Sequence, residues 1–420
     1  MSILLLHKSN ASRRGHLAKA AEYAKENGDR LLVAVRNPTW EKDFADVVVS
    51  VDTSDIEATV AAVRALAATE QEPIRAVAAF VGHSVPAAAA VAADLGLPFI
   101  GEQVARTVRD KYAMREAFAS GNVPQPAYGL ARTPDEAVAQ AARIGFPLVL
   151  KPLIDNDSGY FRRVDDIAEL IEHFPVVQHG AWPRIADNPL YAWMVATYDS
   201  AILLEEYLPG AEISVESIVV DGRAHVVAIH DKPLPMEGPY FFDVHYATPS
   251  RLPAKVQERI VEVTAASHRA VGIETGAVHT EFRIQSDGTP KILETAARLG
   301  GGPVYQSVLL STGVDMVAAV LDVASGRTPD LTPELEPTPA GFYLFFAEKA
   351  GRISGISGVE EVRRNPRVHE LSLYRQVGDF VDVPPRVWQS HGHVIFAADS
   401  DAELVETFDE LVKSIRIEIE

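Results

Sequence analysis

Two glutamates that are predicted to face each other across a tight turn are the first sign of chemistry in this sequence. Two segments with strand character flank Ser286-Asp287-Gly288-Thr289, and Asp-Gly is the strongest short signal for a β-hairpin, because a type I′ turn needs positive φ at both central residues. With a two-residue loop, Glu281 lies opposite Glu294. Facing carboxylates repel unless a cation lies between them, and Mg²⁺ is commonly held by two carboxylates together with phosphate oxygens and water. The alternative is a solvated hairpin face, because a one-residue change of register would separate the glutamates.

The period of a strand predicts which side of this hairpin meets the core. Residues two apart share a face, so Glu281 and Glu294 lie on the side that carries His279, Arg283 and Ala296. The opposite side reads as the core side and carries Val278, Phe282, Ile284 and Leu293. Just after the second strand, Arg298 and the glycines 300–302 offer a guanidinium and accessible backbone N–H groups to an anion.

Composition narrows the classes of protein. The 420 residues suffice for two to four packed units of roughly 100–200 residues each. The net charge of −19 disfavours sequence-independent binding to nucleic acid, and no run of about 18 apolar residues predicts a membrane span. With no cysteine, the chain has no disulfide, thiolate metal site or cysteine nucleophile, and its first apolar stretch is too short for a signal peptide. We expect a cytoplasmic protein that must meet any nucleotide with locally placed Lys and Arg.

Two lysines lie where such a nucleotide could be met. Lys111 lies on a helix predicted over residues 107–120, and Lys151 ends a buried-type strand over residues 146–151. A polar, turn-rich loop over residues 155–159 follows and could cover phosphates, although no Walker A motif is present. A single surface lysine is ordinarily just solvated, so neither lysine is decisive alone.

Two further segments could line a ligand. A strand over residues 201–204 leads into residues 205–208, where the backbone could offer hydrogen bonds to an adenine edge; an ordinary crossover loop is the alternative. Residues 231–250 hold many Pro and Gly and are predicted to form a long loop, and such loops are commonly functional or mobile. Asp243 and His245 in this loop could contact a substrate.

Together these motifs resemble the ATP-grasp superfamily of carboxylate–amine ligases, and within it the L-amino-acid ligases. The motifs that carry the resemblance are Asp110-Lys111, Met114-Arg115, Lys151-Pro152, Glu205 to Glu212, His279 with Glu281, and Glu294 with Arg298-Leu299-Gly300-Gly301. The resemblance covers nearly the whole chain and implies an α/β fold, α+β in the centre, in four parts. These are an N-terminal parallel α/β domain (1–104), the small lobe with preceding helices (105–210), the large lobe with the metal hairpin (211–330) and a C-terminal strand-rich lobe (331–420).

The resemblance also implies roles. For ATP, it implies that Lys111 and Lys151 neutralise the phosphates, that Ser158 and Gly159 cover them, that Glu205, Glu206, Tyr207 and Leu208 line the adenine, and that Glu212 holds the ribose. For catalysis, it implies that Glu281 and Glu294 hold Mg²⁺ or Mn²⁺, that Arg298 binds the transferred phosphate, and that His279, Gly301, Gly302, Asp243 and His245 contact substrates. One departure is Ala296, which stands where many family members have an Asn metal ligand; another is the acidic loop with Asp155 and Asp157.

The implied reaction converts a carboxylate, that of an amino acid by the closest resemblance, into an acyl phosphate that an amine then attacks, giving a dipeptide or related amide with ADP and phosphate. A homodimer is implied as well. Two alternatives stay open. One keeps the fold and changes the substrate, as in a carboxylase or a purine-pathway-type ligase, and the other is a nucleotide-binding protein with little turnover.

Overall fold

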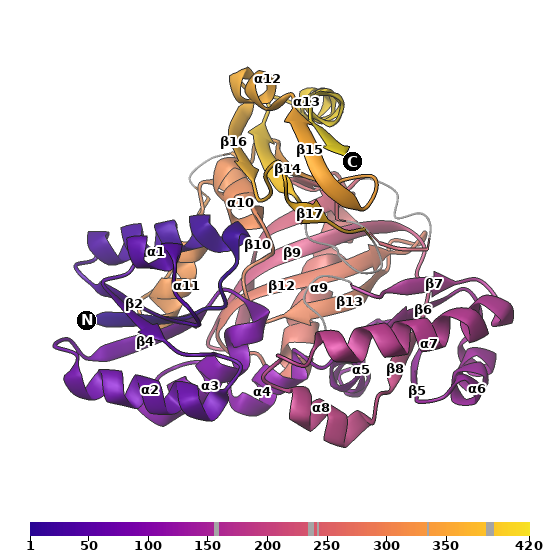
Figure 1. Cartoon of the computed structure of the whole chain (residues 1–420), viewed down its shortest axis with the longest axis horizontal. Helices are drawn as coiled ribbons and strands as arrows, with labels where there is room; N and C mark the ends of the chain where they lie inside the picture. Colours follow the sequence, from indigo (N-terminus) through magenta and orange to yellow (C-terminus); the bar gives the residue numbers. More distant parts are fainter. Residues whose placement is uncertain (155–158, 234–238, 242, 334–335, 384–389) are drawn as a thin grey trace.

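The computed structural model describes residues 1–154, 159–233, 239–241, 243–333, 336–383 and 390–420. Figure 1 shows a parallel α/β domain at the left, a large sheet through the centre, a smaller lobe at the lower right and a strand-rich lobe at the top. The mixed α/β fold expected from the sequence is therefore present. In the described part of the chain no single helix is long and apolar enough to span a membrane. The helices α10 (Val304–Thr312) and α11 (Met316–Ala324) meet that test only as a pair, and they bend by 103° at their break.

The N-terminal domain is built on a four-stranded parallel sheet, as predicted. Its order is β3 (Val47–Ser50), β2 (Arg30–Val35), β1 (Ser2–Leu6) and β4 (Ile74–Ala79). Helix α1 (Arg14–Glu26) covers one face, and α2 (Ile56–Thr69) and α3 (Val85–Leu95) cover the other (Figure 1). All five residues of β1 are buried, the pattern of a parallel strand that is covered on both faces. The turns η1 (Ala11–Arg13) and η3 (Gly82–Ser84) follow the carboxyl ends of β1 and β4, and residues of both line a cavity that they share with residues 184–188 and 374–375.

The smaller lobe holds a four-stranded antiparallel sheet that α6 (Pro134–Ile144) and α7 (Ile167–Arg184) cover. The sheet order is β5 (Tyr128–Ala131), β8 (Ile202–Glu206), β6 (Leu148–Lys151) and β7 (Arg162–Val164). Helix α8 (Tyr191–Tyr198), which the sequence did not predict, packs beside it.

The helix predicted over residues 107–120 is two helices, α4 (Glu102–Thr107) and α5 (Lys111–Ser120). Asp110 ends the continuity because its carboxylate accepts hydrogen bonds from the N–H groups of Tyr112 and Ala113 and so caps α5. Lys111 is therefore the first residue of α5 and lies at the start of a helix, not within one as predicted.

The large sheet has eight strands and runs from the centre of the molecule into the C-terminal lobe. In spatial order they are β13 (Pro290–Ala296), β12 (Gly276–Ile284), β9 (Ala211–Val220), β10 (Arg223–Lys232), β11 (His245–Thr248), β14 (Ala340–Phe345), β18 (Gly392–Ala397) and β16 (Val368–Leu373). The pairing of β11 with β14 carries the sheet across the boundary expected at residue 331. Helices α9 (Ala254–Val271), α10 (Val304–Thr312) and α11 (Met316–Ala324) pack against it.

The long loop predicted over residues 231–250 is thus shorter than expected. β10 continues to Lys232 and β11 begins at His245. The end of β10 was not recognised, although its partner β9 is adjacent in the sequence, because a segment rich in proline and glycine follows it. The strand β11 was not recognised because its partner β14 lies far away in the sequence. The remaining C-terminal elements are α12 (Val359–Arg364), α13 (Asp401–Ser414) and a small sheet of β17 (Phe380–Val381), β15 (Gly351–Ser357) and β19 (Arg416–Ile419).

Candidate active site

The hairpin of β12 and β13 places Glu281 directly opposite Glu294, as the sequence predicted. The predicted type I′ turn is wrong, however, because Gly288 has positive φ (77°) and Asp287 does not. Ile284 pairs with Pro290, so the loop is longer than two residues and shifts the register by one position. A β-bulge between Glu281 and Phe282 shifts it back. The predicted pairing of the glutamates holds because the two offsets cancel.

The bulge also changes which residues of the hairpin lie on its core side. Val278, Phe282 and Ile284 are buried in the core as expected. Leu293, which was expected there, instead lines the cavity that contains Glu281 and Glu294. Ile292, its neighbour, takes the core position and is fully buried.

Each of the two glutamates is paired with a lysine from another part of the chain. Lys111 at the start of α5 forms an ion pair with Glu294. Lys232 at the end of β10 lies 2.7 Å from Glu281 Oε1, and its Nζ also lies 2.7 Å from Glu212 Oε1 and 2.8 Å from Asp243 Oδ1. Burial alone would lower the pKa of Lys232, but the surrounding carboxylates of Asp243, Glu212 and Glu281 raise it well above its ordinary value. This strand position therefore holds a permanent positive charge.

The sequence analysis missed Lys232, although a signal was present. Like Lys151, it is a lysine that closes a strand and is followed by proline. It was instead placed in the predicted long loop, where a lysine does not indicate a site.

The carboxylates that surround Glu281 fit a divalent cation. The donor set around Glu281 is made of carboxylate oxygens, and one such oxygen each from Glu212, Asp243 and Glu281 lies within 4.8 Å of the others. Oxygen-only sites suit Mg²⁺ and Mn²⁺. The ammonium groups of Lys111 and Lys232 contact the carboxylates where a metal would bind, which shows that this region attracts positive charge. Ala296 adds no ligand here; it pairs with His279 on the neighbouring strand.

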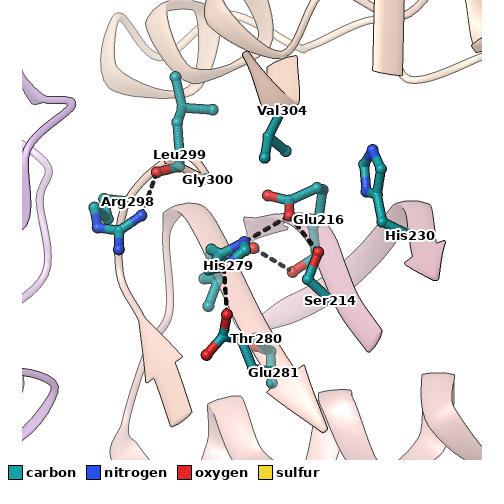
Figure 2. A network of polar contacts seen from close by, with 12 residues as sticks. Ser214, Glu216, His230, His279, Thr280, Glu281, Arg298, Leu299, Gly300 and Val304 are labelled. Carbon is teal, nitrogen blue, oxygen red and sulfur yellow. Dashed lines mark hydrogen bonds and ion pairs between the residues drawn. The ribbon is translucent and has the colours of Figure 1, made fainter. Parts of the chain in front are cut away.

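His279 lies between two carboxylates, as Figure 2 shows. Its Nδ1 is 2.6 Å from Glu216 Oε1, and its Nε2 is 3.5 Å from Glu281 Oε1. Burial would lower the pKa of His279, but the charge and hydrogen bond of Glu216 raise it to about 9. An imidazolium therefore links Glu216 on β9 to Glu281. Glu216 was not among the site residues predicted from the sequence.

The predicted nucleotide residues come together in one cavity beside the glutamates. Glu205, Glu206, Tyr207, Leu208 and Glu212 line it together with Lys151, Phe161, Phe241, Glu281 and Glu294. Glu212 Oε2 lies 2.9 Å from Nη2 of Arg283. Arg163 lies over the ring of Tyr207, with its Cζ 4.4 Å from the ring centroid. The cavity thus combines aromatic surface at one end with charged groups at the other.

Lys151 and Lys111 also come together. Their Nζ atoms lie 5.3 and 5.4 Å from the ring centroid of Phe161. Lys151 Nζ is 2.5 Å from Glu205 Oε2, while Arg115 Nε is 2.6 Å from Glu205 Oε1. Burial raises the pKa of Glu205, but Arg115 and Lys151 outweigh burial and hold it at about 2. The Glu205 carboxylate is therefore paired with the side chains of Arg115 and Lys151. A nucleotide base would have to contact the residues around Glu205 instead of its carboxylate.

The predicted phosphate cover is described only at its end. Ser158, Asp155 and Asp157 lie outside the described residues. Gly159 is described, and a side chain there would collide with Arg184, because a Cβ would lie 2.0 Å from Nη1 of Arg184. The end of the Arg184 side chain would have to move to make room for it.

Arginine side chains gather next to the glycine loop that follows β13. Arg298, Gly301 and Gly302 line the same cavity as Lys111, His279, Glu281 and Glu294. Arg13 of η1 donates from Nη1 to the carbonyl of Gly300 at 2.7 Å. A Cβ at Gly82 would lie 2.8 Å from Nη1 of Arg109 and 3.5 Å from Nε of Arg298. This part of an acidic protein is locally basic and suits an anion, and Arg13 and Arg109 were not predicted.

One predicted substrate contact is not supported. His245 lies on β11, is 4% exposed, and stacks on Phe408 of α13 at a centroid distance of 3.9 Å. Strand alternation turns His245 towards the C-terminal helix and its neighbour Tyr246 towards the cavity, which Asp243, just before β11, also lines. His245 is therefore a packing residue.

Comparison with known proteins agrees with this geometry. Residues 144–305 match the family described as ATP-grasp domain, and residues 343–420 match the L-amino acid ligase C-terminal domain 2. The alanine–anticapsin ligase of Bacillus subtilis (strain 168) is 30% identical over 250 residues, 56% of this chain and 51% of that protein. A D-alanine–D-alanine ligase of Cupriavidus pinatubonensis is 22% identical over 250 residues, 57% of this chain and 71% of that protein.

The fold comparison extends over the full chain. The crystal structure of an L-amino acid ligase from Bacillus licheniformis superimposes with a TM-score of 0.82 at 23% identity and covers 100% of this chain and 98% of that one. By sequence, the chain spans about half the length of the alanine–anticapsin ligases it matches. The chain therefore contains an ATP-grasp domain over residues 144–305 and an L-amino acid ligase C-terminal domain over residues 343–420.

Proposed function

We propose that this protein activates the carboxylate of an amino acid with ATP and joins it to an amine, giving a dipeptide or related amide, ADP and phosphate. The observation that carries this proposal is the facing pair Glu281 and Glu294, which lies in one cavity with Lys111 and Arg298. Two carboxylates beside a guanidinium and an ammonium suit a metal-bound triphosphate next to a reacting carboxylate.

In this proposal the nucleotide lies in the cavity between the two lobes. Tyr207 and Leu208 line the adenine, Glu212 holds the ribose, and Lys111 and Lys151 meet the phosphates. Glu281 and Glu294 hold Mg²⁺ or Mn²⁺, which supplies charge neutralisation to the phosphoryl group when bound. Lys232 keeps Glu212, Asp243 and Glu281 in place, since its ammonium contacts all three.

The two chemical steps make different demands on the protein. In the first step a carboxylate oxygen attacks the γ-phosphorus, and ADP leaves. Negative charge spreads over the transferred group, so positioned cations such as Arg298 and Lys111 stabilise it by electrostatics. In the second step an amine attacks the acyl carbon and phosphate leaves. Gly301, Gly302 and His279 lie where this intermediate would be held.

The remaining parts of the proposal concern the whole protein. We assign a division into parts 1–104, 105–210, 211–330 and 331–420, a homodimeric state and a cytoplasmic location, without nucleic-acid or membrane partners. The net charge of −19 supports the absence of nucleic-acid binding, and the family resemblance supports the dimer.

Release of ADP and phosphate from Mg-ATP in the presence of pooled L-amino acids tests the function, with the product identified by mass. We expect release that depends on the amino acids and an amide product. Release that requires bicarbonate instead would identify a carboxylase, and no stimulation by any pool would contradict a ligase.

A further inference from the structure

A chain of polar side chains around the buried His393 in the C-terminal lobe ends at the active-site cavity, and the two steps above do not use it; its outer member, Glu370, is partly exposed. Tyr374 Oη lies 2.5 Å from Nδ1 of His393, and His393 Nε2 lies 3.2 Å from Oε1 of Glu370. Glu370 is fixed in turn, because it accepts hydrogen bonds from Ser372 Oγ at 2.7 Å and from Gln306 Nε2 at 2.6 Å. The histidine therefore has a hydroxyl on one ring nitrogen and a carboxylate on the other.

Neighbouring strands build this chain. Glu370 and Ser372 share a face of β16, and Ser372 pairs with His393 on β18. Tyr374 follows β16 directly, and its N–H donates to the carbonyl of His391 at 2.8 Å. Gln306 reaches in from α10. Two strands and a helix thus position the members of the chain.

The hydroxyl end of the chain lies where two cavities meet. Tyr374 lines the active-site cavity that contains Glu281, Glu294 and Arg298. It also lines a second cavity of about 530 Å³, to which the N-terminal domain, the smaller lobe and the C-terminal lobe all contribute residues. Lys8, His83, Arg184, Asp187 and Arg375 are among the other residues that line the second cavity. A volume of this size accommodates a small molecule.

Charges around the hydroxyl favour transfer of a proton through it. Hydrogen bonds, that from His393 above all, hold the pKa of Glu370 at about 2, so this carboxylate stays ionised. Burial and Glu370 raise the pKa of Tyr374 above its ordinary value, while Arg13 of η1 opposes the shift. The tyrosine therefore keeps its proton unless it gains another at the same moment. Other ionisable groups near this end of the chain include Tyr305 of α10, Arg298 in the active-site cavity, and Lys8, Arg184, Asp187 and Arg375 in the second cavity.

We propose that Tyr374, His393 and Glu370 form a proton relay that deprotonates the incoming amine in the second step. The role presupposes the ligase activity. The amine stands at the junction of the two cavities, with the acyl phosphate on the Arg298 side. Its ammonium form cannot attack, because the nitrogen lone pair holds a proton, and the relay removes that proton.

The step balances as follows. The ammonium gives one proton to Tyr374 Oη, while the hydroxyl proton of Tyr374 passes to His393 Nδ1, and the imidazolium that forms is stabilised by Glu370. The freed lone pair forms the C–N bond, and the C–O bond to phosphate breaks with its electron pair leaving on the phosphate. The second proton on nitrogen leaves with the phosphate.

Hydroxylamine separates this relay from the first step, because it is a neutral nucleophile near neutrality and traps acyl phosphates as hydroxamates without a base. We compare the wild-type protein with Tyr374→Phe and His393→Gln, using Mg-ATP and pooled L-amino acids with or without hydroxylamine. We expect amide formation to fall by about 10²–10⁴-fold in both variants, the typical contribution of a general base. Hydroxamate formation should keep its wild-type rate.

Tyr343→Phe provides the matched control. Tyr343 lies on β14 in the same sheet, but its ring packs against Phe345 and Phe408, away from the cavity. This variant should keep both activities. The relay is refuted if Tyr374→Phe forms the amide at the wild-type rate, or if it loses hydroxamate and amide together. A wild-type protein that forms no hydroxamate would overturn the ligase activity itself, and with it the relay.

Discussion

Glu281 and Glu294 lie opposite each other on adjacent antiparallel strands, and each carboxylate contacts a lysine that comes from a different part of the chain. Lys111 comes from the start of α5 and Lys232 from the end of β10. Like charges directly across a ladder destabilise a hairpin, so the arrangement persists because cations compensate it. The pair is the centre of the proposed chemistry, and the predictions below start from it.

Replacing Glu294 with alanine should abolish turnover while the fold is kept. The carboxylate is a proposed metal ligand, and we expect the rate of ADP release to fall by at least about 10³-fold, comparable to losing a strong electrostatic contact in a transition state. Steady-state ADP release together with circular dichroism measures both properties. Near-normal turnover in a folded variant would remove Glu294 from the metal site.

Replacing Lys232 with methionine should destabilise the protein. Three carboxylates would lose their shared cation, and breaking a buried pair leaves charge uncompensated at about 3–5 kcal/mol. Because a divalent cation can replace the missing charge, Mg²⁺ should raise the free energy of unfolding of this variant more than that of the wild type. Urea unfolding with EDTA and with Mg²⁺ measures the difference. Equal responses of the two proteins to Mg²⁺ would show that the three carboxylates do not hold a cation.

Replacing Arg298 with alanine should stop the first chemical step while ATP still binds. Arg298 lines the cavity next to Glu294, and in the described structure its Nη1 donates to the carbonyl of Leu299 at 2.8 Å. We expect hydroxamate formation to disappear and ATP affinity, measured by calorimetry, to change little. Full hydroxamate formation in this variant would exclude Arg298 from the mechanism.

Stability should fall in acid partly through Glu205. Its folded pKa of about 2 lies below the ordinary value of 4.5, because Arg115 and Lys151 outweigh the burial that would raise it. A lowered pKa stabilises the fold above the ordinary value, and this contribution is lost as the pH falls through about 4.5 towards about 2. The shift corresponds to about 3 kcal/mol.

Glu205→Gln removes that titration. Between pH 5 and pH 2 the free energy of unfolding of the wild type should therefore fall by about 3 kcal/mol more than that of Glu205→Gln. Urea unfolding at a series of pH values measures both slopes. Parallel slopes would mean that Glu205 does not titrate with a lowered pKa.

The sequence predicted what short-range patterns determine. Alternation and the Asp-Gly pair predicted the facing glutamates, although the turn type was wrong and two one-residue offsets cancelled. The N-terminal parallel domain that the resemblance implied is present, and its strands β1, β2 and β4 are nearly continuous apolar runs, as strands buried on both faces are.

Residues that long-range pairing brings into the site were not predictable in this way. Arg13 contacts Gly300, which is 287 positions later in the chain. His245 was misplaced because the pairing of β11 with β14 decides its direction, and β14 begins at Ala340. Glu370, Ser372 and Tyr374 are spaced by two in the sequence, but only the pairing of β16 with β18 adds His393.

Binding of Mn²⁺ in the presence of ADP, followed by electron paramagnetic resonance, tests the central assignment most directly. The wild-type protein should bind Mn²⁺ in a manner that depends on ADP, and Glu281→Gln and Glu294→Gln should each weaken this binding by at least about 10–100-fold. Unchanged Mn²⁺ affinity in both variants would contradict the assignment of the facing glutamates as the metal site.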